Sequence, residues 1–263
     1  MFINNLNPSI VEFGPLTIRW YGLLFTLGII LCLLVVRKLV LKNKLSLDTF
    51  YSLAVYLVLG AIVGARLGYV LFYNLSYYLN NPLAILEIYR GGLSSHGGLL
   101  GIIIASLIFY FFKKRKNRDF KFYKYADLII IGLPLVIVCI RLGNFINSEI
   151  VGRVTDLPWG VIFNNHGGSL ARHPVQLYEA LAALIIFGLL FIFYKIIKNK
   201  KPYLMTFIFI FIYFGSRFLI EFTKEYQVTT GLLTMGQWLS ILPIIISLIY
   251  FSFYFFTKNI KSK

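Results

Sequence analysis

The feature that most constrains the fold of this chain is a series of long apolar stretches separated by short polar segments. A membrane-spanning helix needs about 20 consecutive, mostly apolar residues. Of the 263 residues, 59% are hydrophobic. The sequence predicts seven spans, over residues 17–36, 49–73, 94–112, 125–142, 174–194, 203–222 and 236–256. We therefore expect an all-α integral membrane protein, a single seven-helix membrane domain over residues 1–263.

The basic residues predict the orientation of these helices. The net charge of +16 would by itself also suit a nucleic-acid-binding protein. However, 18 of the 26 basic residues follow the first, third, fifth and seventh spans, and the positive-inside rule places such segments in the cytoplasm. We expect the N-terminus outside, the C-terminus in the cytoplasm, residues 1–16 as an outer arm and residues 143–173 as an external loop segment. No nucleic-acid partner is expected.

The remaining eight basic residues differ in kind and position. Seven are arginines, whereas 15 of the 18 on the cytoplasmic side are lysines. Charge alone sets orientation, but the planar guanidinium suits a phosphate or carboxylate. These eight lie outside the membrane or near the outer ends of spans: Arg19, Arg66, Arg90, Arg141, Arg153, Arg172, Arg217 and Lys224. The histidines 96, 166 and 173 lie on the same side, so we expect the chemistry to face outward.

The segment from Arg141 to Gly152 follows an apolar run and is unusually rich in polar side chains. Arg141 and Asn144 are three residues apart and share one helix face. A guanidinium at the edge of the hydrocarbon layer is costly unless an anionic group compensates it. A lone arginine could instead snorkel to lipid head groups. Asn147 and Glu149 nearby favour a polar site.

The third predicted span opens with Ser94-Ser-His-Gly-Gly98. A serine cap would leave the first N–H groups of the helix directed outward as an anion site. The helix dipole there disfavours an imidazolium, which keeps His96 neutral and able to accept a proton. Gly97 and Gly98 suit either close helix packing or backbone contacts to a ligand. His96 is therefore a candidate functional residue.

Other patterns have both a functional and a structural interpretation. In the sixth span Tyr213, Arg217 and Glu221 recur every four residues and form one stripe. The two charges could simply neutralise each other, and an arginine paired in this way can still bind a phosphate. Glu179 lies more than a turn inside the fifth span, so we expect a buried Arg or Tyr partner. Tyr21 belongs to a possible aromatic belt at the first span.

Glycines at positions 60, 64 and 68 predict a seam of close helix packing in the second span.

Together these motifs resemble the prolipoprotein diacylglyceryl transferase family. The resemblance covers nearly the whole chain and rests on residues 18–22, 64–69, 95–99, 141–152, 173–179, 217–222 and 234–240. The Arg-x-Gly-Asn-Phe-Ile-Asn run that begins at Arg141 is highly specific. After Glu221 the family usually continues with Arg-Glu-Pro-Asp, but here the residues are Lys224-Glu-Tyr-Gln227. The resemblance therefore assigns no role to that turn.

The resemblance implies a multi-pass enzyme of the bacterial cytoplasmic (inner) membrane with its active site toward the outer face. It would transfer the diacylglyceryl group of phosphatidylglycerol to the lipobox cysteine thiol of prolipoproteins, forming a thioether and releasing glycerol phosphate. This is the first step of bacterial lipoprotein maturation. The implied partners are phosphatidylglycerol, prolipoprotein signal peptides with a lipobox cysteine, and membrane lipid. No cofactor or metal is expected.

The resemblance also implies roles for individual residues. The catalytic set is His96, Arg141, Arg217 and Tyr21, with His96 as the base for the thiol and His173 as a weaker second candidate. Arg141 and Arg217 would clamp the phosphate, and Glu149 and Glu221 would orient the arginines. The implied phosphatidylglycerol-binding residues are Arg141, Asn144, Asn147, Glu149, Arg217, Glu221, Gly97 and Gly98.

Two other function classes fit parts of the sequence. A small transporter or channel for an anionic solute would line its path with the arginines, but transporters place their site near the bilayer midplane. Here the charges gather toward one face, which favours an enzyme. An intramembrane protease is the third reading, because Gly167-Gly-Ser169 and a histidine loosely resemble a serine dyad.

The charge pattern makes a testable prediction about orientation. Lys44 and Lys116 should lie in the cytoplasm and His166 outside, because basic segments stay on the cytoplasmic side. Single-cysteine variants at these positions can be probed on intact cells with a membrane-impermeant thiol reagent. Only position 166 should react. Labelling at 44 or 116, but not at 166, would reverse the orientation and with it the outward-facing site.

Overall fold

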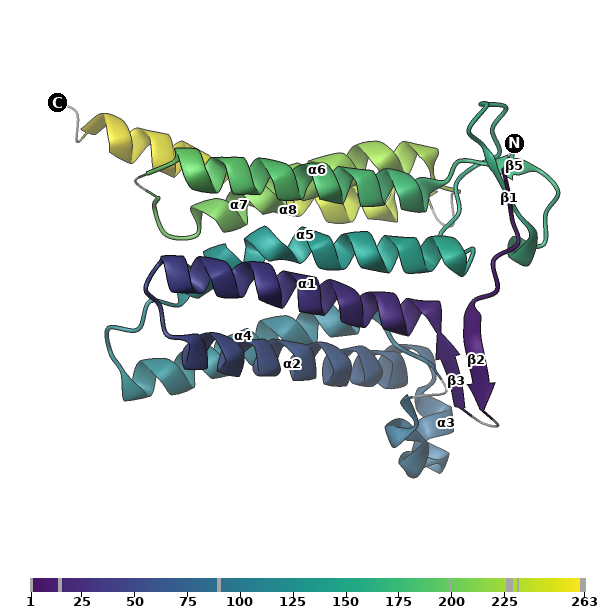
Figure 1. Cartoon of the computed structure of the whole chain (residues 1–263), viewed down its shortest axis with the longest axis horizontal. Helices are drawn as coiled ribbons and strands as arrows, with labels where there is room; N and C mark the ends of the chain where they lie inside the picture. The colour runs from purple at the N-terminus through teal and green to yellow at the C-terminus, as the bar shows by residue number, and fades with distance from the viewer. Residues whose placement is uncertain are drawn as a thin grey trace. The chain divides into compact units, whose positions relative to one another are not determined.

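The computed structural model describes residues 2–13, 16–88, 91–198, 200–225, 229–230 and 232–260 (Figure 1). Contacts divide the chain into two compact units. The first unit comprises residues 1–36 and 126–263, and the second comprises residues 37–125. The expectation of a single seven-helix domain stays a prediction.

Seven helices in the described part of the chain are long and apolar enough to cross a membrane, which confirms the predicted number of spans. None of the four short helical segments in the same described part approaches the length of a span. The seven long helices are α1 (Trp20–Lys42), α2 (Leu47–Tyr73), α4 (Ser95–Lys116), α5 (Phe122–Ile146), α6 (Val175–Ile196), α7 (Leu204–Ile220) and α8 (Met235–Ile260).

The first span begins later than the sequence predicted. Residues expected to start the helix form β3 (Leu16–Arg19), which pairs antiparallel with β2 (Ser9–Phe13). The β-branched Thr17 and Ile18 suit a strand, and this hairpin leaves the helix to begin at Trp20.

Short elements also occupy predicted loops. In the second unit, α3 (Leu75–Asn80) and the 3₁₀ helix η1 (Pro82–Leu86) lie between α2 and α4. Pro82 stands in the first turn of η1, where its missing N–H costs nothing. In the first unit, the 3₁₀ helix η3 (Asn164–His166) directly follows the strand Val161–Phe163.

A small sheet in the first unit joins the predicted outer arm, residues 1–16, to the predicted external segment, residues 143–173. Its strand order is β1 (Phe2–Asn4), β4 (Val161–Phe163) and β5 (Ala171–Arg172), with β1 parallel and β5 antiparallel to β4 (Figure 1). Val151 and Phe163 are buried with Val161 in a cluster against which Phe145 packs. This cluster therefore lies directly against the last turn of α5.

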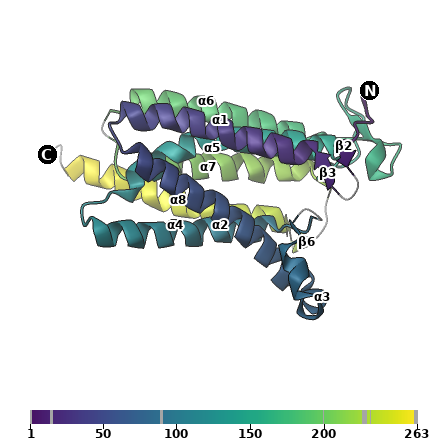
Figure 2. The same cartoon turned by 60° about the horizontal axis from the view of Figure 1, so that its bottom comes forward.

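The helices of the first unit are joined by polar as well as apolar contacts. α7 packs against both α6 and α8 (Figures 1 and 2). The Asp127 carboxylate accepts hydrogen bonds from the Thr206 backbone N–H (2.9 Å) and hydroxyl (2.7 Å). It thus caps the first turn of α7 from α5, which explains an acid within an apolar run.

The connection from α7 to α8 consists of a 3₁₀ turn and a short hairpin. The 3₁₀ helix η4 (Glu221–Thr223) follows α7 directly, and the hairpin is formed by β6 (Thr229–Thr230) and β7 (Leu233–Thr234).

In the second unit, α2 and α4 approach closely along a seam of small residues (Figure 2). A Cβ at Gly60 would lie 2.6 Å from the Gly101 carbonyl oxygen, and one at Gly68 would lie 2.6 Å from Gly97 Cα. These distances leave no room for a side chain, so the predicted packing role of the α2 glycines is confirmed.

Arg66 has a structural environment although the sequence grouped it with the outer arginines. Its guanidinium is buried and donates to backbone carbonyls that include those of Ile85 (2.8 Å) and Gly91 (2.7 Å). Arg66 therefore fastens the segment between η1 and α4 to α2. Arg90 lies outside the described residues.

Candidate functional site

The last turn of α5 extends into the segment that the sequence assigned to the external loop, residues 143–173. The helix continues to Ile146, and the Asn147 N–H still donates to the Gly143 carbonyl (3.0 Å). Gly143 lies within this helix, and a side chain there would clash with Tyr21, because a Cβ at Gly143 would be 2.9 Å from Tyr21 Cδ2. The extra turn keeps Arg141 and Asn144 on one helix face.

Four of the predicted residues form one hydrogen-bonded network at this helix end. Arg141 Nη1 donates to Asn144 Oδ1 (3.1 Å). Asn144 Nδ2 donates to Glu149 Oε2 (2.9 Å), and Asn147 Nδ2 donates to Glu149 Oε1 (3.2 Å). Glu149 therefore acts on Arg141 through Asn144. Tyr21 packs against Gly143, between Arg141 and Asn144 in sequence, and so lies beside the same helix end.

The backbone around Glu149 is strained. Ser148 (φ 57°) and Ile150 (φ 56°) both adopt the left-handed conformation. This conformation is uncommon for any residue other than glycine, and for the β-branched Ile150 it is an outlier. Such residues cost about 1–3 kcal/mol each and persist only where their surroundings hold them. Two buried amides from distant segments contact this region: Gln176 Nε2 donates to the Glu149 carbonyl (2.5 Å), and Asn4 Nδ2 donates to the Phe145 carbonyl (2.7 Å).

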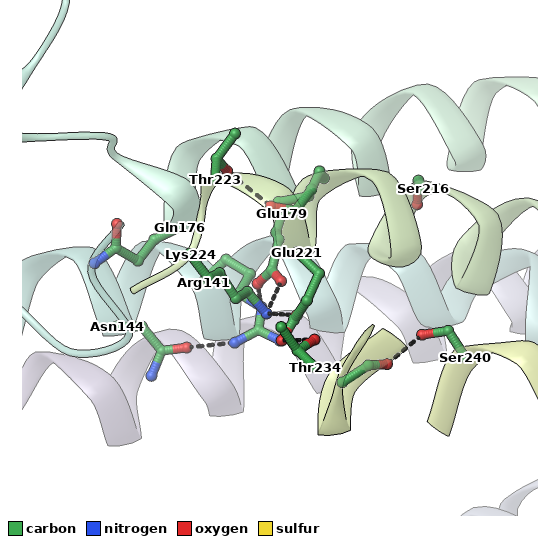
Figure 3. Close-up of polar contacts among 12 residues, drawn as sticks. Arg141, Asn144, Gln176, Glu179, Ser216, Glu221, Thr223, Lys224, Thr234 and Ser240 are labelled. Carbon is green, nitrogen blue, oxygen red and sulfur yellow. Dashed lines mark hydrogen bonds and ion pairs between the residues drawn. The ribbon is translucent and has the colours of Figure 1, made fainter. Parts of the chain in front are cut away.

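A buried carboxylate of α6 connects this network to the segment after α7. Glu179 Oε2 lies 2.6 Å from Arg141 Nε, as an ion pair rather than an aligned hydrogen bond, and Glu179 Oε1 lies 2.8 Å from Lys224 Nζ (Figure 3). The prediction of a buried arginine partner for Glu179 is thus confirmed. An acid in a membrane span needs such compensation, and Glu179 receives it from two cations.

The predicted pairing of Glu221 with Arg217 is wrong. Among the described residues, no ion pair joins the two, and Glu221 Oε2 instead lies 3.1 Å from Lys224 Nζ. Glu221 Oε1 accepts a hydrogen bond from the Thr234 hydroxyl (3.3 Å). The four-residue spacing itself persists, because the Glu221 N–H still donates to the Arg217 carbonyl, but the Glu221 carboxylate is engaged by Lys224 and Thr234 instead.

Arg217 lies near the ion pairs made by Glu179, but its own environment is a small cavity. Its Nε is buried without a hydrogen-bond partner in the protein. Arg217, Tyr213 and Glu179 line a cavity of about 10 Å³, a volume close to that of one enclosed water site. Arg217 therefore shares its surroundings with the carboxylate that holds Arg141.

Lys224 reaches the site through a close backbone contact. Gly152 forms an antiparallel bridge with Lys224, and a Cβ at Gly152 would lie 2.6 Å from the His173 carbonyl oxygen and 2.7 Å from that of Thr223. Only glycine fits there. The sequence analysis grouped Lys224 with the outer basic residues and expected a buried partner for Glu179, but it included neither residue in the site. Tyr226 and Gln227, the rest of the noted departure from the family, lie outside the described residues.

The predicted residues of α4 lie in the second unit. His96 is exposed in the first turn of the helix, and Ser94 is the predicted cap, because its hydroxyl accepts from the Gly97 N–H (3.3 Å) and its carbonyl from the Gly98 N–H (2.9 Å). These bonds give the two glycines capping and packing roles. A lipid contact by either glycine stays a prediction.

His173 takes part in a separate contact chain at the start of α6. Its Nδ1 lies 3.1 Å from the Tyr178 hydroxyl, which accepts from Trp159 Nε1 (2.8 Å). Burial, and secondarily the charge of Arg153, lower the pKa of His173, so this imidazole is neutral at neutral pH. Ser169 is exposed and, within the described residues, bonds to no histidine, so the protease reading has no dyad.

Comparisons with known proteins agree on one family. The family model for prolipoprotein diacylglyceryl transferase matches residues 8–253. A relative from Tolumonas auensis is 38% identical over 244 residues, covering 92% of this chain and 93% of that protein. Relatives from Bordetella parapertussis and Geobacter sulfurreducens are each 41% identical, with 90% of both chains covered. All three are named phosphatidylglycerol–prolipoprotein diacylglyceryl transferase. The chain belongs to the prolipoprotein diacylglyceryl transferase family.

Proposed function

We propose that this chain is a transferase that moves the diacylglyceryl group of phosphatidylglycerol onto the lipobox cysteine thiol of a prolipoprotein, forming a thioether and releasing glycerol phosphate. Family membership and the names of the relatives support the transfer itself. The main support for the position of the site is the environment of Arg141, whose guanidinium lies between Glu179 and Asn144 at the end of a membrane span.

The contacts of Arg141 leave part of its guanidinium for a ligand. Glu179 engages Nε and Asn144 engages Nη1, whereas a guanidinium carries five N–H donors in a fixed plane. The remaining donors suit a bidentate contact with a phosphate. Because two neighbours already fix the plane, the donors need little reorganisation when charge develops on the phosphate.

The chemistry uses these groups in a displacement at carbon. The thiolate sulfur attacks the diacylglyceryl carbon that carries the phosphate oxygen, so a C–S bond forms as the C–O bond breaks. The electron pair leaves on the phosphate of glycerol phosphate, where Arg141 and Arg217 stabilise the negative charge. His96 takes the thiol proton, since only the thiolate is an effective nucleophile.

The location we propose is the bacterial inner membrane, with the site at the outer face. Arg141, Glu179 and Lys224 gather at one end of the helices of the first unit. Lys195 and Lys201, at the other ends of α6 and α7, belong to the basic segments that the positive-inside rule assigns to the cytoplasm. A site on the outer side would meet both outer-leaflet phosphatidylglycerol and an exported peptide.

Purified full-length protein incubated with phosphatidylglycerol and a lipobox peptide tests the proposed reaction. Mass spectrometry should find the peptide heavier by one diacylglyceryl group and glycerol phosphate released in equal amount. A peptide with serine in place of the cysteine is the control and should stay unmodified. If the cysteine peptide also stayed unmodified, or if its modification needed no cysteine, the proposed function would be wrong.

The role of His96 gives a second prediction. His96→Gln should keep phosphatidylglycerol binding but slow transfer by roughly 10²–10⁴ at neutral pH, the usual contribution of a positioned base. The defect should shrink as the pH rises toward the free-thiol pKa of about 8.5, because thiolate then forms without a base. Lipid binding and single-turnover transfer are measured on the same variant across pH.

A matched control is His166→Gln, which changes an exposed histidine of the external segment and should transfer at the normal rate. Loss of lipid binding in His96→Gln would make His96 a head-group ligand. A defect that does not depend on pH would mean that the proton leaves by another route, and His173 would be examined next.

A further inference from the structure

Glu149 stands between two residues in a backbone conformation that they rarely adopt. The left-handed conformations of Ser148 and Ile150 turn the chain sharply on both sides of Glu149. This turn is what directs the Glu149 carboxylate back toward Asn144 and Asn147 on the preceding helical turn. A relaxed, extended backbone at 148–150 would carry the carboxylate away from both amides.

One side chain contacts the centre of this turn from another helix. Gln176 lies in the first turn of α6, is fully buried, and donates from Nε2 to the Glu149 carbonyl at 2.5 Å. A buried carbonyl without a partner is costly, so this bond favours the turn over conformations that move the carbonyl elsewhere. Asn4 donates to the Phe145 carbonyl and to the Ser148 hydroxyl (3.5 Å), so it holds the end of α5 and the start of the turn, but it does not reach Glu149.

The contacts continue from the turn to the guanidinium proposed to hold the phosphate. Glu149 orients Asn144, and Asn144 accepts from Arg141 Nη1. The other contact of Arg141, with Glu179, does not involve the turn. Loss of the turn would therefore leave Arg141 in place but remove the group that sets the rotation of its plane.

We propose that Gln176 is a positioning residue for the transfer: it holds residues 148–150 in the strained turn that keeps Glu149 on Asn144 and thereby orients Arg141. This inference rests on the proposed function for its kinetic consequence, but its structural part stands by itself. Gln176 does not need to touch either substrate.

The test compares Gln176→Met, an unbranched apolar replacement of similar size, with the unchanged protein. We expect kcat to fall about 10²-fold, the typical effect of misplacing a group by roughly 1 Å, while KM for phosphatidylglycerol changes little. Hydrogen–deuterium exchange should become faster in the peptide covering residues 144–153. In the unchanged protein, the Glu149 N–H in this peptide donates to the Asn144 carbonyl, and the substitution should weaken that bond. Gln176→Asn, which keeps the amide on a shorter side chain, should show the same pattern more weakly and serves if the Met variant fails to fold.

A second substitution separates positioning from substrate contact. Adding Ile150→Gly to Gln176→Met should raise kcat at least tenfold above that of Gln176→Met alone and should slow the hydrogen–deuterium exchange again. The reason is that glycine adopts a positive φ without cost. Lys44→Gly is the matched control: Lys44 also has a positive φ (54°), but lies in the other unit. It should stabilise the protein without restoring activity.

The possible outcomes are distinct. If Lys44→Gly rescued kcat as well as Ile150→Gly, the defect would be one of general stability and the proposal would fail. A raised KM with unchanged kcat, or no rescue by Ile150→Gly, would make Gln176 a substrate contact instead. If the unchanged protein showed no transfer at all, the proposed function would fail, and the exchange data alone would decide on the turn: unchanged exchange in Gln176→Met would overturn it.

Discussion

The site depends first on one buried carboxylate, that of Glu179, placed within a membrane span. A charge at that depth must be compensated, and Glu179 contacts both Arg141 and Lys224. These cations come from α5 and from the segment after α7, so a single acid fixes the ends of three elements relative to one another. Lys224 then holds Glu221, and Glu221 in turn accepts from Thr234 at the start of α8.

The charges of this cluster explain how a polar site can exist at the edge of the membrane. Arg141, Arg217 and Lys224 are matched by three carboxylates, those of Glu149, Glu179 and Glu221. Glu179 and Glu221 keep Arg141 and Lys224 compensated and fixed in position before a lipid arrives, whereas Arg217 has no carboxylate partner among the described residues. A phosphate that binds here meets donors whose direction is already set, which is the condition under which electrostatic stabilisation of a transition state is largest.

The sequence predicted the seven spans because the bilayer imposes a length and polarity on each one. The predicted start of the first span was wrong because the residues of β3 are as compatible with the start of an apolar helix as with a strand. The network from Arg141 to Glu149 was predictable, since its members are near in sequence. The partnership of Glu179 with Lys224 was not, because the two residues meet only through tertiary folding. The predicted pair of Arg217 and Glu221 failed although the helical backbone continues to Glu221, because Lys224 and Thr234 engage the Glu221 carboxylate.

A double-mutant cycle between Arg141 and Glu179 tests most directly whether Glu179 acts by holding Arg141. Transfer rates are measured for Arg141→Lys, Glu179→Gln and the double variant, each purified and checked for folding by thermal denaturation. Arg141→Lys should lose roughly 10²–10³ in rate, because lysine keeps the charge but not the planar fork. If Glu179 acts by holding Arg141, Glu179→Gln should add little to that loss in the double variant, because the guanidinium that Glu179 positions is already absent. Losses that multiply in the double variant would show that the two residues act independently and would contradict it.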